Sequence, residues 1–248
     1  MANEAPTEFN YRVFHLPLDD PNKLLYYAGK FSTLHLSALQ KSAGSFGSTF
    51  ARESAWNIDQ WVARLTRPSM HTFIAVAYAV DLPSEQQTLE TGDWIGCGTL
   101  IGPTPYEIYH VPASGGPQLG PDSEEDKWHM TFVYNEPSHR RKGVSKRLIL
   151  ASCEYTDKIA NQQGKKSWMR VYMHPSAVAA RSLYTSCGFK EAGDCSWHEA
   201  AHGNGDADLL PEDHDSETNR EKYHSRIGLG LMRRSDGADF GVNGVSKK

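Results

Sequence analysis

Three consecutive cations beside a glycine form the stretch with the most specific chemistry: Arg140, Arg141, Lys142, Gly143, Val144 and Ser145. The stretch lies between an expected strand and an expected helix. A helix start leaves backbone N–H groups unpaired and carries partial positive charge, and Gly143 allows the backbone to approach a ligand closely. The stretch therefore predicts a pyrophosphate site, and the alternative interpretation is a solvated basic helix start. It matches neither G-x-G-x-x-G nor a P-loop, so those nucleotide-binding folds are less favoured.

A second stretch, His198-Glu199-Ala200-Ala201-His202, has the spacing of a zinc peptidase motif. On a helix, two histidines four residues apart share a face and bind zinc, and the glutamate serves as general base. Asp208 would be a third ligand. A zinc metallopeptidase therefore stays open as an alternative function.

The residues around this stretch favour a different interpretation. Gly203 and Gly205 follow it and no apolar face accompanies it, so we expect a solvated loop instead of a helix. Adventitious binding of nickel or zinc by His198, His202 and His214 is the remaining metal hypothesis. We expect no metal cofactor.

Hydrophobic periodicity predicts strands and helices around both stretches. Strands are expected at 11–16, 70–80, 94–101, 128–134, 167–173, from Phe189 onward and at 223–232. Helices are expected at 20–40, about 52–65, 141–161 and 177–187, and long loops at 102–127 and 193–222. This order predicts an α/β fold with a mixed central β-sheet flanked by helices.

Composition and charge exclude several classes of partner. The 26 basic and 30 acidic residues give a net charge of -4, so no overall field attracts nucleic acid. Apolar runs have strand length and no secretory signal opens the sequence. Four widely spaced cysteines favour reduced thiols. We therefore expect a cytoplasmic protein that binds neither nucleic acid nor a membrane.

Two motifs together resemble the GNAT N-acetyltransferase superfamily. The family's pyrophosphate loop, Arg/Gln-x-x-Gly-x-Gly/Ala, follows a strand that ends near a proline, and the matching stretch is Arg140-x-x-Gly143-x-Ser145 after Pro137. The second family motif, Ala-x-x-Leu-Tyr-x-x-x-Gly-Phe, is matched by Ala180-x-x-Leu183-Tyr184-x-x-x-Gly188-Phe189.

The resemblance covers roughly residues 70–192, with two departures. Ser145 stands where the family has glycine or alanine, and Ala177 replaces an asparagine that often binds the cofactor. The resemblance implies a single GNAT-type domain. Residues 1–69 would supply a strand and helices on the acceptor side, 70–235 the acetyl-CoA-binding core with insertions at 102–127 and 193–222, and 236–248 a flexible tail.

The resemblance also implies roles for individual residues. An amine would attack acetyl-CoA directly in a ternary complex, and Tyr184 would protonate the departing thiolate. The amine needs a base, for which Glu53, His129 and Glu136 are unranked candidates. The cofactor would be bound by Phe132, Val133, Tyr134, Arg140, Arg141, Lys142, Gly143, Val144, Ser145 and Ala180.

The expected function is acetyl transfer from acetyl-CoA to the amine of a small molecule. Three alternatives stay open: acetylation of a protein or peptide amine, a non-catalytic CoA-binding module, and the zinc peptidase. The sequence leaves the acceptor, the acyl group and the oligomeric state undecided. A final strand with an exposed edge is compatible with a homodimer.

Overall fold

The structure of the chain, a computed structural model, describes residues 8–204 and 207–238. The expected tail at 236–248 lies outside the described residues from 239 onward. The chain divides into two compact units. Among the described residues, the first comprises 8–67, His71–Gly98 and Phe132–Ala151, and the second comprises Pro68–Met70, Thr99–Thr131, 152–204 and 207–238. Strands β3 and β4 and helix α5 each run from one unit into the other.

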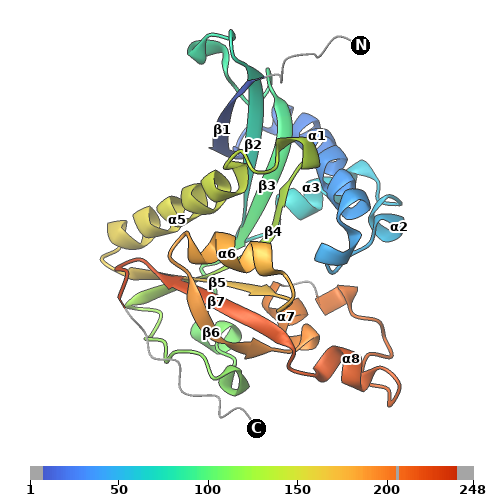
Figure 1. The fold of residues 1–248 in the computed structure, drawn as a ribbon, viewed down its shortest axis with the longest axis vertical. Helices are drawn as coiled ribbons and strands as arrows, with labels where there is room; N and C mark the ends of the chain where they lie inside the picture. Colours follow the sequence, from blue (N-terminus) through green and yellow to red (C-terminus); the bar gives the residue numbers. More distant parts are fainter. Residues whose placement is uncertain (1–7, 205–206, 239–248) are drawn as a thin grey trace. The chain divides into compact units, whose positions relative to one another are not determined.

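Seven strands form a mixed sheet (Figure 1). They are β1 (Phe9–His15), β2 (Met70–Ala79), β3 (Asp93–Ile101), β4 (Glu125–Asn135), β5 (Lys166–Met173), β6 (Lys190–Cys195) and β7 (Gly228–Arg234). Their order in the sheet is β1-β2-β3-β4-β5-β7-β6. The β4–β5 pair is parallel, whereas β1–β2, β5–β7 and β6–β7 are antiparallel. The predicted α/β fold, a mixed sheet flanked by helices, is confirmed.

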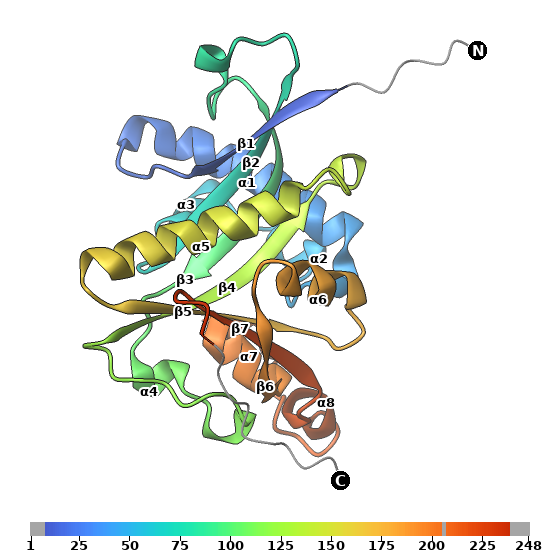
Figure 2. The same ribbon diagram turned by 60° about the vertical axis from the view of Figure 1, so that its left-hand side comes forward.

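In the first unit, the strands separate two layers of helix (Figure 2). Successive strand residues point to opposite faces. Ile74, Val76 and Tyr78 share a core with α1 (Pro21–Lys41) and α3 (Ile58–Leu65). On the other face, a Cβ on Gly96 would lie 2.8 Å from the Tyr134 carbonyl oxygen of β4 and 3.3 Å from Leu148 of α5 (Val144–Gln162). Glycine at this position therefore leaves room for the β4 backbone and for α5.

Helix α1 confirms the helix expected at 20–40. The side chain of Asp20 caps it by accepting a hydrogen bond from the Asn22 backbone N–H, and Pro21 occupies its first turn. One face is buried because apolar residues recur at helical spacing. The buried residues are Tyr27, Ala28, Phe31, Leu34, His35, Ala38 and Leu39.

The single helix expected at about 52–65 is wrong. The structure has two helices there, α2 (Phe50–Glu53) and α3. Asn57 accounts for the break, because its side chain accepts from the Gln60 N–H while the Gln60 side chain accepts from the Asn57 N–H. This reciprocal capping box begins a new helix.

In the second unit, both segments expected as loops contain helices. The stretch from 102 includes α4 (Tyr106–Tyr109) and ends at residue 124, where β4 begins. The expected loop at 193–222 is also wrong: β6 extends into it, and α7 (Trp197–Asn204) and the start of α8 (Arg220–His224) follow. Helix α6 (Val178–Thr185) lies between β5 and β6 in the chain.

Two further observations concern the whole of the described chain. All four cysteines are buried and none forms a disulfide. Among the described residues, no helix combines the length and the apolar character that crossing a membrane requires.

Candidate active site

Strand β4 is irregular at Phe132. Its φ is +51°, in the left-handed region, which costs a non-glycine residue about 1–2 kcal/mol. The β4–β5 ladder joins Glu125–His129 to Lys166–Arg170, whereas β4 continues to Asn135. Backbone strain of this kind gathers at functional positions. The strained residue Phe132 therefore lies just beyond the point at which the ladder between β4 and β5 ends, at His129.

Two rings stack on Phe132. The His35 ring lies 3.8 Å from it between centroids at an interplanar angle of 10°, and the Phe46 ring lies at 4.3 Å and 25°. Phe46 also meets the ring of Tyr134 edge-on. The irregular part of β4 in the first unit therefore lies against an aromatic cluster that the N-terminal segment supplies.

His35 and Glu53 form a buried pair beside this cluster. Their Nε2 and Oε2 atoms are 2.8 Å apart, and their side chains are 1% and 0% exposed. Burial lowers the pKa of His35 and outweighs the contact with Glu53. Burial alone would raise the pKa of Glu53, but His35, Arg64 and Ser48 together lower it. The lowered pKa of His35 and the lowered pKa of Glu53 together indicate a neutral imidazole beside an ionised carboxylate.

Hydrogen bonds fix the loop that follows β4. The Glu136 N–H donates to the Ile95 carbonyl (2.8 Å), and the Asn135 side chain donates to the His139 carbonyl (2.9 Å). Arg140 donates from Nε to the Asn135 carbonyl (3.3 Å) and from Nη2 to Ser42 Oγ (3.0 Å). Arg140 therefore anchors the loop in this conformation.

The next residues turn the chain into α5. Arg141 and Gly143 both have positive φ, +61° and +79°. The Gly143 carbonyl accepts the first helical hydrogen bond, from the Arg147 N–H (3.1 Å), so Gly143 occupies the cap position. Arg141 and Lys142 are exposed, and a Cβ on Gly143 would meet nothing within 4 Å. An open helix start between exposed cations can bind an anion.

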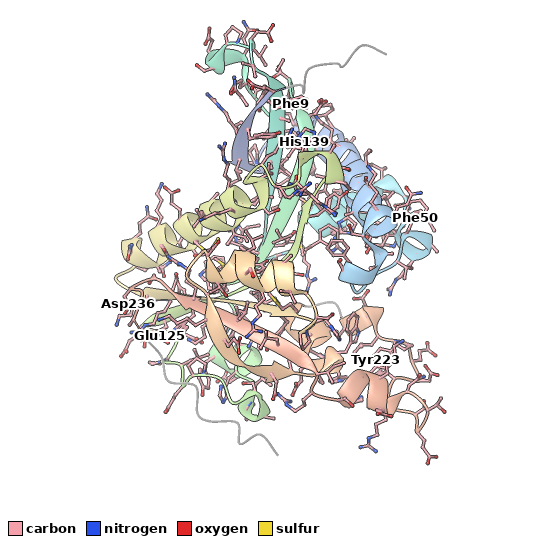
Figure 3. All side chains as sticks on the ribbon, viewed as in Figure 1. Phe9, Phe50, Glu125, His139, Tyr223 and Asp236 are labelled. Carbon is pink, nitrogen blue, oxygen red and sulfur yellow. The ribbon has the colours of Figure 1, made fainter. Side chains whose placement is uncertain are left out.

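His139 connects this loop to β1 (Figure 3). Its Nδ1 lies 3.1 Å from the Tyr11 hydroxyl, and its ring meets the Phe9 ring edge-on at 5.0 Å. Burial and the charge of Lys142 lower the pKa of His139. His139 therefore holds the loop without adding a charge at neutral pH.

The carboxylate of Glu136, the third candidate base, accepts hydrogen bonds from two residues of the first unit. One carboxylate oxygen accepts from Ser37 Oγ (2.6 Å) and the other from Lys41 Nζ (2.7 Å). Burial would raise its pKa, but the contacts from Lys41 and Ser37 lower it. Its side chain is 16% exposed, so this carboxylate reaches solvent where that of Glu53 does not.

Helix α6 carries the second motif in the second unit. Tyr184 is buried and its ring packs edge-on against Phe189. Burial, with Cys153 and Cys187 nearby, raises the pKa of Tyr184 above its ordinary value, so the phenol keeps its proton at neutral pH. Ala180 is half-buried one turn earlier.

His129 lies in a buried polar network of the second unit. Its Nδ1 accepts from Arg170 Nε (3.3 Å), and Arg170 Nη1 donates to the Tyr109 carbonyl (2.6 Å). The guanidinium lies over the rings of Tyr109 and Tyr172, 3.9 and 4.6 Å from their centroids. One imidazole nitrogen of His129 is thus occupied by the protein itself.

Within the first unit, the structure brings Glu53 to Phe132 through His35. Within the second, it joins His129 to Arg170, a pair that the sequence did not indicate. His35 was missed as well, although a signal existed: it is a histidine inside the apolar face of α1, between Leu34 and Leu39. A polar ring on such a face needs a buried partner.

The H-E-x-x-H stretch is helical, contrary to expectation. Ser196 begins α7 in a capping box, since its Oγ accepts from the Glu199 N–H (3.1 Å) and Glu199 Oε2 accepts from the Ser196 N–H (2.8 Å). Glu199 also accepts two hydrogen bonds from Arg226 Nη1, at 2.5 and 2.7 Å. Glu199 is therefore a structural residue and is not placed as the base of a zinc peptidase.

A known protein family matches part of the chain. Residues 92–191 match the model of the acetyltransferase (GNAT) domain. A sequence search of curated proteins found no match.

Solved structures resemble the chain at low identity. NAA60 of Arabidopsis thaliana, in complex with a bisubstrate analogue, is 10% identical over 90% of this chain and 98% of that chain, with a TM-score of 0.51. A chimera of the spermidine N-acetyltransferase SpeG from Vibrio cholerae and hSSAT is 12% identical over 91% and 96%, with a TM-score of 0.50. At these identities the likeness shows the fold alone.

The matched segment runs from the start of β3 to the start of β6 and includes the loop before α5 and the motif on α6. Residues 92–191 therefore form an acetyltransferase domain of the GNAT type, the domain of acyl-CoA-dependent N-acyltransferases.

Proposed function

We propose that the chain transfers an acetyl group from acetyl-CoA to the amine of a small molecule, by direct attack in a ternary complex. The observation that carries the proposal is the loop that begins α5, where Arg141 and Gly143 have positive φ and two exposed cations adjoin an open helix start. The pyrophosphate of CoA has the charge and the acceptor oxygens that such a loop binds.

The roles within this loop differ from residue to residue. Arg140 anchors it through Asn135 and Ser42, whereas Arg141 and Lys142 would supply charge to the cofactor. Val144 is buried and holds the first turn of α5 to the unit, and Ser145 follows it on the half-buried side. The N–H groups of this turn would donate to the phosphates.

Strand β4 would bind the remainder of the cofactor. Beyond His129 its backbone is not part of the ladder with β5, so Phe132, Val133 and Tyr134 would offer N–H and carbonyl groups to the pantetheine amides and the thioester oxygen. The left-handed residue Phe132 would orient these groups, and Ala180 on α6 would leave room for the cofactor.

Tyr184 would act as the general acid. The phenol carries its proton at neutral pH, and because burial raises its pKa it would assist the departing thiolate by donating a hydrogen bond before full proton transfer. Of the candidate bases, the buried carboxylate of Glu53 and the buried imidazole of His129 would act only through bound water, whereas Glu136 reaches solvent. The segment 1–69 would form the acceptor side, because it supplies the rings over Phe132.

Calorimetric titration with acetyl-CoA, with and without a chelator, tests the cofactor site. Micromolar binding that survives the chelator, and that is lost in Arg141→Glu/Gly143→Glu, supports the proposal. Gly164→Glu is the matched control, because Gly164 also has positive φ and open surroundings but lies after α5. Absence of binding to the unaltered protein would overturn the proposal.

Release of free thiol with a panel of amines then identifies the acceptor. The panel contains polyamines, single primary amines and short peptides with free N-termini. Turnover of small amines with no turnover of peptides is the expected result. Peptide turnover alone would replace the small-molecule acceptor with a protein acceptor, and cofactor binding without any thiol release would indicate a non-catalytic CoA-binding module.

A further inference from the structure

Four histidines and one aspartate gather between β6 and β7 in the second unit. Helix α7 supplies His198 and His202, the following segment supplies His214 and Asp215, and α8 supplies His224. Helices α7 and α8 lie side by side (Figures 1 and 2). The His198 ring is 4.4 Å from that of His202, 5.2 Å from that of His214 and 4.7 Å from that of His224 between centroids.

Three of these side chains direct their donor atoms to one point. His224 Nε2 is 2.8 Å from Asp215 Oδ1, His214 Nδ1 is 3.5 Å from the same oxygen, and the two nitrogens are 3.4 Å apart. Ligands at about 2.0–2.1 Å from a tetrahedral zinc ion are roughly 3.3 Å from one another. Two of the three distances therefore agree with that spacing, and the third needs a small widening.

We propose that His214, Asp215 and His224 bind a divalent transition-metal ion such as Zn²⁺, with His198 next to the open position. Two imidazoles and one carboxylate are donors that zinc accepts, and they disfavour magnesium and calcium, which prefer oxygen ligands. This site differs from the H-E-x-x-H interpretation of the sequence, because His214, Asp215 and His224 replace His198, His202 and Asp208 as ligands.

Neighbouring contacts hold the donors in place. Asn219 Nδ2 donates to Asp213 Oδ2 (2.9 Å), which fixes the turn that carries His214 and Asp215. Arg226 follows α8 and binds both Asp194 of β6 and Glu199 of α7. Arg226 occupies these two carboxylates, and Asp215 Oδ1 is the carboxylate oxygen that contacts His224 Nε2 and lies near His214 Nδ1. The ion would join α8 and the preceding turn, and its role would be structural, since a bound ion stabilises the folded state.

Zinc titration of the full-length, untagged protein tests the site. We expect one ion per chain with micromolar or tighter affinity. His214→Gln/His224→Gln should weaken binding by at least about 100-fold, since even the loss of outer partners weakens sites by 10–100-fold. The control is His15→Gln/His71→Gln, which removes another histidine pair whose ring centroids are 5.5 Å apart. Circular dichroism verifies that each variant is folded.

A second readout is independent of affinity. Co²⁺ in the site should give the visible absorption of a tetrahedral complex, and the double variant should lack it. Failure of the unaltered protein to bind zinc overturns the proposal, as does equal binding by the double variant. A larger loss in His202→Gln than in His224→Gln would also overturn it, because the ligands would then be those of the H-E-x-x-H pair.

Discussion

The imidazole of His35 lies flat on the ring of Phe132, with 3.8 Å between centroids and an interplanar angle of 10°. One partner is the neutral half of a buried pair with Glu53, and the other is the residue of β4 with left-handed backbone geometry. The stack therefore connects a helix of the N-terminal segment to the strained position of the central strand. The stacking of the two rings stabilises this backbone conformation and offsets part of its energetic cost.

The strain at Phe132 predicts an unusual preference for glycine. Phe132→Gly should be more stable than Phe132→Ala by about 1 kcal/mol, because alanine retains the cost of positive φ and glycine does not. Both variants lose the stacked ring and should be less stable than the unaltered protein. Urea unfolding measures both free energies.

Thr131 supplies the comparison for this prediction. It is the preceding residue of β4 and does not have positive φ. Glycine in an ordinary strand position is less stable than alanine by about 0.5–1 kcal/mol. Thr131→Gly should therefore be the less stable of its pair. The same order at both positions would show that Phe132 is not strained in solution.

The buried pair predicts a loss of stability in acid. Because the pKa of His35 is lowered by burial, the unfolded chain binds a proton below about pH 6.5 that the folded chain resists, so stability falls as pH falls. Glu53 adds a further loss at lower pH, because its pKa is also lowered and the unfolded chain therefore binds this proton more readily than the folded chain. Unfolding free energies at pH 7.5, 6.5 and 5.5 measure the slope.

Variants of the pair separate its parts. Glu53→Leu leaves the His35 ring without its buried partner and should cost about 1–3 kcal/mol at pH 7.5. His35→Phe/Glu53→Leu replaces the whole pair with apolar side chains, and should recover part of that loss and flatten the slope between pH 6.5 and 5.5. A slope in the double variant equal to that of the unaltered protein would assign the acid sensitivity to other groups.

Substitutions at Gly143 and Gly164 should separate the cost of positive φ from the loss of acetyl-CoA binding. Both have positive φ, +79° and +68°, and both are surrounded by open space, so alanine should destabilise the fold to a similar extent at either position, by about 1 kcal/mol. Only Gly143→Glu should weaken acetyl-CoA binding, by 10-fold or more, because its carboxylate repels the pyrophosphate. Calorimetry at two salt concentrations measures the effect, and equal losses at both glycines would remove the loop from the cofactor site.

Local patterns predicted the elements that begin and end at clear signals. Helix α1 follows the cap at Asp20, and β3 and β5 agree with their expected ranges to within a residue. The sequence predicts one helix in place of α2 and α3 because the apolar pattern continues through the break. The signal that separates the two helices is the pair Asn57 and Gln60. A capping box was thus available in the sequence and was outweighed by periodicity.

The candidate site was predictable only where a motif is contiguous. The loop at 140–145 is local, and its helix-start geometry agrees with the expectation. Arg170 and Arg226 act through partners that are distant in the chain, so periodicity carries no information about them, whereas the signal for His35 is its position on the apolar face of α1. Helix α7 was missed although Ser196 and Glu199 have the local spacing of a capping box. The contact that the sequence could not indicate is that of Glu199 with Arg226, 27 residues away.

Tyr184 predicts a loss of turnover that exceeds any loss of stability. Tyr184→Phe keeps the ring against Phe189 and removes only the hydroxyl, so the unfolding free energy should change by less than about 1.5 kcal/mol. If the phenol protonates the thiolate, kcat should fall by about 100-fold or more with little change in the KM for acetyl-CoA. Tyr155→Phe on α5 is the control and should retain its kcat.

Because the pKa of Tyr184 is raised, ionisation of the phenol should not lower kcat at any pH below about 10. A kcat in Tyr184→Phe equal to that of the unaltered enzyme would assign Tyr184 to packing alone, and thiolate departure would then need no proton from this residue.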